Sequence, residues 1–373
     1  MPTPIQYHYG KFPPNNIDWE KLVPLLGPAA SALARYDGLL TAIPNAAVLL
    51  SPLTTKEAVL SSRIEGTQAT MGEVLEYEAE PGDKSVSPEK AADINEILNY
   101  RTAMREAEQQ LEDLPLCGRV IKAAHQTLLS GVRGHGKSPG DYRKGANWIG
   151  PPGCTIEEAK YVPISFDKLP DAMSNWEKFV HSKQPDKLVQ LGIIHAEFEA
   201  LHPFLDGNGR LGRMCIPLFM FYQKMIQSPM FYVSEFFEKN RDEYYERLLA
   251  ISRSNDWTGW SIFFLKAIVE QAESNQTKAE AILKLYDEMK TRVAELTHSQ
   301  YAIHAVDFIF HRSVFSTPDF VADPRIPDST ARNIIRTLRD NSILKDIRPS
   351  SGRRPAIVAF TDLINITEGS QVL

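Results

Sequence analysis

The sequence predicts a mainly α-helical fold with one small β-hairpin, and the spacing of its apolar residues is the main reason. KEAVLSSRIEG, AADINEILNYRTAMREAEQQLEDL, LVQLGIIHAEFEAL and NRDEYYERLLAIS each place apolar residues three or four positions apart, as amphipathic helices do. Strand patterns are scarce. The exception is residues 146–164, where ANWIG and KYVPI flank the turn-rich PPGCTIEE and predict a short hairpin within a helical domain.

The composition is typical of a globular protein with two or three domains. The chain has 373 residues, of which 43% are hydrophobic and 24% charged. Lys and Arg total 41 against 47 Asp and Glu, so the formal net charge of −6 argues against binding nucleic acid through bulk charge. Three cysteines without CxxC spacing predict neither a disulfide framework nor a structural zinc site. With no signal-peptide pattern and only short apolar runs, we expect a cytoplasmic protein without a membrane partner.

Changes along the chain predict three regions. Loops are expected at EPGDKSVSPEK, near residues 80–90, and in the Gly-rich stretch 131–145. From about Thr277 the pattern changes to a polar helix followed by short helices. We therefore predict an N-terminal helical region over residues 1–90, a central core over 91–276 and a C-terminal domain over 277–373.

The densest group of reactive residue types is HPFLDGNGR, which begins at His202 and follows a predicted helix. Pro203 disfavours a helical conformation at His202, so that helix should end there. Gly207, Asn208 and Gly209 can turn the backbone so that consecutive N–H groups converge, before RLGRMCIPLFMFY resumes as a buried helix. An anion nest at a buried helix N-terminus is a site for phosphate.

The side chains of this segment could each take part in phosphate chemistry. His202 could accept a proton from an attacking hydroxyl at neutral pH. Asp206 offers a hard oxygen to magnesium, which would keep most of its water and take phosphate oxygens as well. Arg210 and Arg213, on one helical face, could bind further phosphates. A histidine before proline is usually a cap or core residue and DGNG is usually a turn, but their combination with two arginines favours a phosphate-transfer site.

HPFLDGNGRLGR resembles the signature of the Fic family, HPFx(D/E)GN(G/K)RxxR, and matches it at every defined position. Fic proteins are mainly helical enzymes that generally transfer AMP from ATP to a Ser, Thr or Tyr hydroxyl. The resemblance implies that ATP is the substrate and Mg²⁺ the cofactor. It also implies that His202 is the base, that Asp206 binds magnesium and that Phe204 anchors the loop. Gly207, Asn208 and Gly209 would surround the phosphates, and Arg210 and Arg213 would contact the outer ones. Some relatives with Lys at the position of Gly209 transfer phosphate, and others use donors such as CDP-choline. Gly209 favours AMP transfer.

SSRIEGTQAT, upstream of the core, resembles the inhibitory helix of Fic proteins, (S/T)xxxE(G/N), through Ser61, Glu65 and Gly66. Ser61 and Glu65 lie four positions apart on one helical face, and Gly66 is a natural C-terminal stop. A carboxylate bound by Arg213 would occupy that arginine and displace the γ-phosphate of the nucleotide. Spacing alone would favour an exposed glutamate on a helix, whereas a complete Fic core favours inhibition.

Two further segments resemble parts of the Fic site. NWIGPPGCTIEEAKYVPI is placed like the flap that aligns a target by strand addition, although an ordinary surface hairpin has the same pattern. EFFEKNRDEYYERL resembles the segment that lines the adenine and ribose pocket, with Asn240, Tyr244 and Tyr245 as candidate contacts. Tyrosine pairs on helices are more often core residues, so both interpretations of these residues stay open.

The C-terminal residues from about Phe315 resemble a winged helix-turn-helix with a wing around Gly352. Arg332, Arg336 and Arg339 would share one exposed face, with Arg353 and Arg354 at the wing tip. Such a local basic surface is typical of DNA-binding domains. Because the whole chain is acidic and many winged helices bind only proteins, DNA is the less favoured partner.

The predicted fold is therefore a helical Fic core with a small β-hairpin flap, an N-terminal helical layer and a C-terminal winged helix-turn-helix. The expected function is a cytoplasmic protein adenylyltransferase, autoinhibited by Glu65, that acts on a protein target or on itself. Family likeness makes a homodimer plausible. Two alternatives stay open: a DNA-binding regulator with a nucleotide-sensing Fic core, and a hydrolase that removes AMP at the same site, with Glu65 orienting a water.

Overall fold

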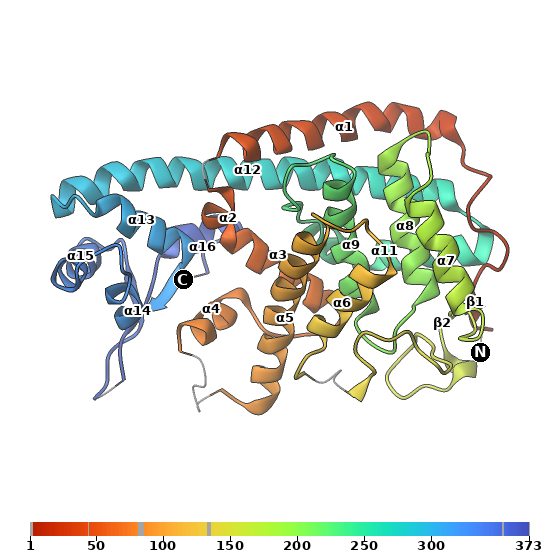
Figure 1. Cartoon of the computed structure of the whole chain (residues 1–373), viewed down its shortest axis with the longest axis horizontal. Coiled ribbons are helices and arrows are strands. Elements are labelled where there is room, and N and C mark those ends of the chain that lie inside the picture. The colour runs from red at the N-terminus through yellow and green to blue at the C-terminus, as the bar shows by residue number, and fades with distance from the viewer. Residues whose placement is uncertain (1–2, 44, 81–85, 133–135, 353, 373) are drawn as a thin grey trace. The chain divides into compact units, whose positions relative to one another are not determined.

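The structure, a computed structural model, describes residues 3–43, 45–80, 86–132, 136–352 and 354–372. These residues form sixteen α-helices and five short strands (Figure 1), which confirms the predicted mainly α-helical fold. The loops expected near 80–90 and 131–145 include residues 81–85 and 133–135, which lie outside the described residues. Among the described helices, none combines the length and apolarity needed to cross a membrane.

Chain contacts divide the protein into two compact units. The first comprises residues 1–37, 60–67 and 98–273, and the second comprises residues 38–59, 68–97 and 274–373. Four helices have residues in both units: α1 (Trp19–Ala42), α3 (Ser51–Ile64), α5 (Pro88–Gln110) and α12 (Trp257–Thr297). The borders predicted near residues 90 and 276 stay predictions.

Two buried helices form the centre of the first unit. α8 (Lys187–Leu201) and α9 (Asn208–Tyr222) pack against each other and are buried on almost every side. The sequence pattern predicts an amphipathic α8, but this helix has no solvated face and also buries Gln190, His195 and Glu197. Asp186 begins α8 by accepting hydrogen bonds from the N–H groups of Leu188 and Val189, at 2.8 and 2.9 Å. Around this pair lie α6 (Gly118–Leu128), α7 (Leu169–Val180), α10 (Ser234–Lys239) and α11 (Arg241–Ser254).

The predicted hairpin is present, but its pairing is short. Ile149 forms an antiparallel bridge to Tyr161 in β2 (Tyr161–Val162), on either side of a 3-10 turn at Ile156–Glu158. The other edge of β2 pairs in parallel with β1 (Ile5–Gln6), a strand that the sequence analysis did not predict. Next to β1, the Tyr7 hydroxyl donates to Glu197 on α8 at 2.6 Å. This hydrogen bond connects the N-terminal segment to the centre of this unit.

The second unit contains a three-stranded antiparallel sheet in the order β3-β5-β4. Its elements from residue 302 onward are α13 (Ala302–His311), β3 (Val314–Ser316), α14 (Thr317–Val321), α15 (Asp328–Asp340), β4 (Lys345–Arg348), β5 (Ile357–Ala359) and α16 (Thr361–Glu368). This is the element order of a winged helix-turn-helix, with Gly352 between the wing strands at φ 58°. The unit also includes α2 (Ala46–Leu49) and α4 (Met71–Ala79).

Candidate functional site

A six-residue loop joins α8 to α9 and places His202 close to the N-terminus of α9. His202 ends α8 in a left-handed conformation, with φ 47° and ψ 60°, directly before Pro203. Gly207 turns the chain again at φ 76°, and α9 begins at Asn208. The side-chain amide of Asn208 accepts from the N–H of Phe204 at 2.8 Å and donates to its carbonyl at 2.9 Å, so it closes the loop.

The N-terminus of α9 is a buried, electropositive end. The first N–H groups of a helix have no acceptor within it and carry a partial positive charge. Asn208, Gly209 and Arg210 supply these groups, and all three residues are buried. A Cβ atom at Gly209 would lie 2.0 Å from Oε1 of Glu65, so the space beside the helix end already holds a carboxylate.

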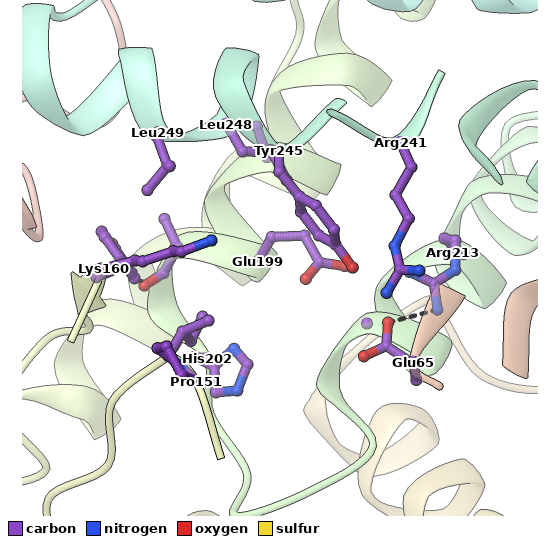
Figure 2. Close-up of a pocket in the computed structure, with 16 residues that line it drawn as sticks. Glu65, Pro151, Lys160, Glu199, His202, Arg213, Arg241, Tyr245, Leu248 and Leu249 are labelled. Carbon is purple, nitrogen blue, oxygen red and sulfur yellow. Dashed lines mark hydrogen bonds and ion pairs between the residues drawn. The ribbon is translucent and has the colours of Figure 1, made fainter. Parts of the chain in front are cut away.

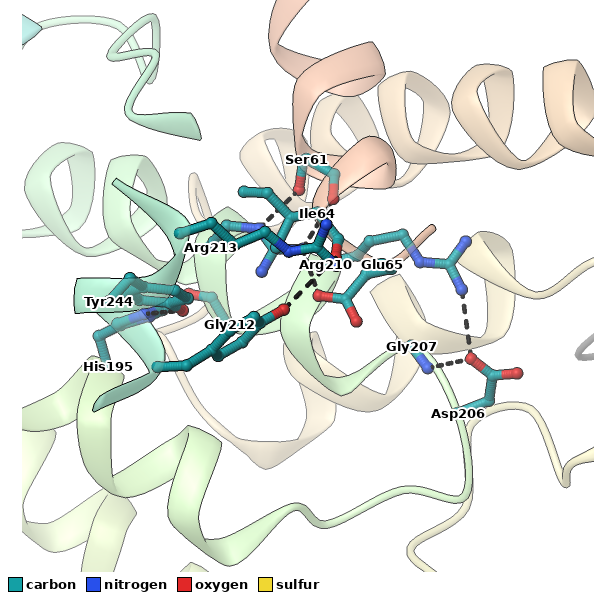
Figure 3. Close-up of polar contacts among 12 residues, drawn as sticks. Ser61, Ile64, Glu65, His195, Asp206, Gly207, Arg210, Gly212, Arg213 and Tyr244 are labelled. Carbon is teal, nitrogen blue, oxygen red and sulfur yellow. Dashed lines mark hydrogen bonds and ion pairs between the residues drawn. The ribbon is translucent and has the colours of Figure 1, made fainter. Parts of the chain in front are cut away.

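Arg213 holds the C-terminal turn of α3 through three hydrogen bonds (Figure 3). Its Nε donates to the Ser61 hydroxyl at 3.0 Å, and Nη2 donates to the Ser61 carbonyl at 2.8 Å and to Glu65 Oε1 at 2.7 Å. Arg213 is fully buried, whereas the side chain of Glu65 is 35% exposed. Gly66 follows at φ 101°, where the helix has ended. The structure thus brings together the Ser61, Glu65 and Gly66 motif with Arg213.

The ion pair determines the charge state of both partners. Burial alone would raise the pKa of Glu65, but Arg213 outweighs it and holds that pKa below its usual range. For Arg213, burial would lower the pKa, but the carboxylate of Glu65 raises it. Both groups are therefore charged at neutral pH, and a second anion at Arg213 must compete with Glu65.

His202 is placed as an uncharged base. The residue is half-buried, and its Nδ1 has no hydrogen-bond partner among the described residues. Burial lowers the pKa of His202 to about 4, although the nearby carboxylate of Glu65 opposes this effect. The imidazole is therefore neutral at physiological pH and can accept a proton.

Asp206 is the residue of this loop that could hold a metal ion. Its Oδ1 accepts from the N–H of Gly207 at 2.6 Å and pairs with Nη2 of Arg210 at 3.3 Å, while 42% of its side chain is exposed. No cluster of three or more His, Cys, Asp or Glu side chains suited to a metal occurs among the described residues. One accessible carboxylate fits Mg²⁺, which binds proteins through few side chains and retains water and phosphate ligands.

Two buried side chains that the sequence analysis missed support the loop. The guanidinium of Arg143 donates from Nε to the carbonyl of His202 at 3.0 Å and from Nη1 to the carbonyl of Gly145 at 3.2 Å, and it also contacts the carbonyl of Ile164. His125 contacts the carbonyl of Asp206 through Nε2 at 3.0 Å. No motif marks these residues, because an arginine in a Gly-rich loop is usually exposed and a histidine is intermediate in burial.

Replacing Arg143 with methionine is expected to destabilise the protein by roughly 2–4 kcal/mol, because several buried carbonyl oxygens would lose their donor. Urea unfolding measures the change. Lys144→Met is the matched control, since Lys144 is the exposed neighbour and should change stability by less than about 0.5 kcal/mol. Equal stabilities of the two variants would refute the supporting role of Arg143.

His202 and Arg213 open into one cavity of about 420 Å³ (Figure 2). This volume is in the range of small-molecule sites. Its charged side includes Glu65, Arg213 and Arg241. Its other lining residues are Ile149, Gly150, Pro151, Lys160 and Tyr161 from the hairpin, Ala196, Glu199, Ala200 and His202 from α8 and its end, Gly209 from α9, and Tyr245, Leu248 and Leu249 from α11.

The structure does not bring every predicted nucleotide contact to this cavity. Tyr244 is buried in the core, where its hydroxyl lies 2.9 Å from Nε2 of His195. Asn240 donates to the carbonyl of Phe236 at 2.9 Å, between α10 and α11. Tyr245 lines the cavity instead, and Arg241 beside it donates to the carbonyl of Ile64 at 2.6 Å.

Family profiles match most of the first 220 residues. The profile described as "Fic/DOC family N-terminal" matches residues 23–109, and the profile "Fic/DOC family" matches residues 115–220.

Solved structures share the fold at low sequence identity. A Fic family protein from Desulfovibrio desulfuricans G20 has a TM-score of 0.60 and 22% identity, over 94% of this chain and 98% of that one. A Fic domain containing signaling protein from Bacteroides thetaiotaomicron has a TM-score of 0.54 and 16% identity, over 69% and 97%. Fic-1 (residues 134–508) from C. elegans has a TM-score of 0.50 and 17% identity, over 73% and 79%.

Proposed function

The chain belongs to the Fic family, and from this premise we propose that it is a protein adenylyltransferase restrained by Glu65. It transfers AMP from ATP to a Ser, Thr or Tyr hydroxyl of a protein target, or of the enzyme itself. One observation carries the proposal: His202 and the buried N-terminus of α9 meet in one cavity beside Arg213, which binds the carboxylate of Glu65.

In the proposed reaction the residues of the loop and of α9 have separate roles. His202 takes the proton of the target hydroxyl as its oxygen attacks the α-phosphorus of ATP. The bond between the α-phosphorus and the bridging oxygen breaks, and pyrophosphate leaves. The N–H groups at the start of α9 and the guanidinium of Arg213 stabilise the phosphate charge. Asp206 would hold Mg²⁺, which supplies Lewis-acid stabilisation of that charge when bound.

Glu65 restrains the reaction by occupying the phosphate site. Its carboxylate pairs with Arg213 and lies against Gly209, where the outer phosphates of a productive nucleotide would bind. Two anions cannot share these donors without strong repulsion, so ATP must displace the carboxylate or bind unproductively. Transfer is therefore slow while α3 holds its position.

Positional labelling of ATP tests the proposed chemistry. The Glu65→Gly form is incubated with cell lysate and with ATP labelled at either the α- or the γ-phosphate. Only label that is lost when His202 is also replaced with alanine is counted, which discounts labelling by the kinases of the lysate. Such protein-bound label is expected from the α-position alone, because AMP retains that phosphorus. Label from the γ-position would instead show phosphate transfer, and absence of label from either position would favour a nucleotide-sensing regulator.

The pH dependence of kcat/KM is expected to show no acid limb near the ordinary histidine value of about 6.5. The pKa of His202 in the free enzyme is lowered to about 4, so the base is already deprotonated at pH 6 and loses activity only as the pH falls toward 4. Rates of AMP transfer at several pH values measure this. An acid limb at the ordinary histidine value would show that burial does not lower the pKa of the catalytic base.

A second candidate function is DNA binding by the second unit. Arg332, Arg336 and Arg339 are exposed and line a groove between α14 and α15. By contrast, Arg354 pairs with Glu80 at 3.0 Å, and Arg353 lies outside the described residues. A gel shift at low salt that weakens in the Arg332→Ala, Arg336→Ala double variant is expected if the groove binds DNA. No shift at low salt would eliminate this function.

A further inference from the structure

Glu199 is a carboxyl group in the cavity with no role in the mechanism above. It lies on α8, three residues before His202, and in Figure 2 its carboxyl group stands among the cavity residues near Tyr245. Its Oε1 is buried and has no hydrogen-bond partner among the described residues. A Cβ atom at Gly212 would lie 2.3 Å from Oε1, so α9 packs closely against this side of the carboxyl group. Glu199 as a residue lines the cavity, so a ligand there meets the carboxyl group through the oxygen that does not face α9, and Oε1 can take part once the carboxyl group rotates.

The carboxyl group keeps its proton at neutral pH. Burial raises the pKa of Glu199 to about 8, Arg213 opposes the shift and Glu65 adds to it. A protonated carboxyl group offers one O–H donor beside one carbonyl acceptor, whereas a carboxylate offers acceptors only. The charged and titratable groups facing it from the neighbouring elements are Glu65 in the turn after α3, Arg213 and Cys215 on α9, Tyr244 and Tyr245 on α11, His202 at the end of α8, and Lys160 and Arg241 in the cavity wall.

The position of Glu199 matches the nucleoside part of a bound nucleotide. Phosphates at the start of α9 would direct the rest of the nucleotide over α8 and α11. The wall there includes Ala196, Ala200, Leu248 and Leu249, which offer apolar surface to a base but no hydrogen bonds. Glu199, the Tyr245 hydroxyl and the amino group of Lys160 are the polar groups that this part of the wall presents, and of these Glu199 can both donate through an O–H and accept through a carbonyl.

Resting on the proposed function, we propose that Glu199 selects the nucleobase. Its O–H donates to a ring nitrogen and its carbonyl accepts from an adjacent amino group, which is the pattern of the 6-amino edge of adenine. A ligand without the amino group would leave the buried carbonyl unpaired and would bind more weakly. Glutamine at this position would preserve the pattern and leucine would remove it.

Equilibrium binding separates the base contact from catalysis. The Glu65→Gly protein and its Glu199→Gln and Glu199→Leu derivatives are titrated with ATP and with the triphosphate of purine riboside, which lacks the 6-amino group. We expect the parent and Glu199→Gln to prefer ATP by roughly tenfold, and Glu199→Leu to bind the two ligands equally. A preference retained in Glu199→Leu overturns the proposal.

Two further binding measurements distinguish a contact of Glu199 with the base from a contact with the ribose. If Glu199→Leu changes the ratio of ATP to 2′-deoxy-ATP affinities but not the amino-group preference, Glu199 contacts ribose and the proposal falls. Removal of Glu65 takes away one of the causes that raise the pKa of Glu199 to about 8, so this pKa lies lower in the parent. Raising the pH through that pKa should weaken ATP binding to the parent but not to Glu199→Gln, and parallel changes in both would contradict the proposal. If no form binds any nucleotide, the proposed function fails as well, whereas nucleotide binding without the amino-group preference refutes only the role of Glu199.

Discussion

Replacing Glu65 with glycine is expected to raise the rate of AMP transfer tenfold or more, which corresponds to about 1.4 kcal/mol or more of relieved competition. The carboxylate that occupies Arg213 and the space beside Gly209 would be gone, so the outer phosphates of ATP could bind there. Transfer of α-labelled AMP to protein, with parent and variant at equal concentration, measures the effect.

Glu112→Gly provides the matched control for this substitution. Glu112 is also a glutamate in a turn directly after a helix, in the same unit, but it is exposed and does not line the cavity. Its replacement should leave the transfer rate unchanged. If Glu65→Gly were no faster than the parent at saturating ATP, the Glu65–Arg213 pair would be a structural contact without an inhibitory role.

Replacing His202 with alanine in the Glu65→Gly background is expected to lower AMP transfer by roughly 10²–10⁴-fold, the usual contribution of a general base. ATP binding should persist, because the N–H groups of α9 and the side chain of Arg213 remain. The transfer rate and the dissociation constant for ATP, measured on the same preparation, separate the two effects.

The left-handed backbone of His202 calls for a second variant. Asparagine tolerates φ 47° better than alanine does, so His202→Asn removes the base with less change in the loop. His181→Ala, at the exposed end of α7, controls for losing a histidine elsewhere in this unit. If His202→Asn folds normally and still transfers AMP at the rate of its parent, His202 is not the base.

The local features of the site could be predicted from the sequence because short-range chemistry determines them. Pro203 forces the end of α8, and Gly207 allows the turn that starts α9, so the loop geometry follows from neighbouring residues. The four-residue spacing of Ser61, in the last turn of α3, and Glu65, in the turn that follows, likewise places both on one side, where Arg213 binds them.

Features that depend on long-range packing could not be predicted in the same way. Tyr244 and Tyr245 are adjacent and chemically identical, and only the packing of α11 decides that the first is buried against His195 and the second faces the cavity. The pairing of β1 with β2 joins residues more than 150 positions apart and carries no local pattern. Glu199 gave no signal either, since a glutamate on a helix is usually exposed.

A crystal structure of the Glu65→Gly protein with Mg²⁺ and a non-hydrolysable ATP analogue tests the central claim most directly. We predict the triphosphate at the N–H groups of Asn208, Gly209 and Arg210, an outer phosphate on Arg213 in place of Glu65, and the imidazole of His202 facing the α-phosphate. Phosphates bound elsewhere, or a His202 ring directed away from the α-phosphate, would contradict the account.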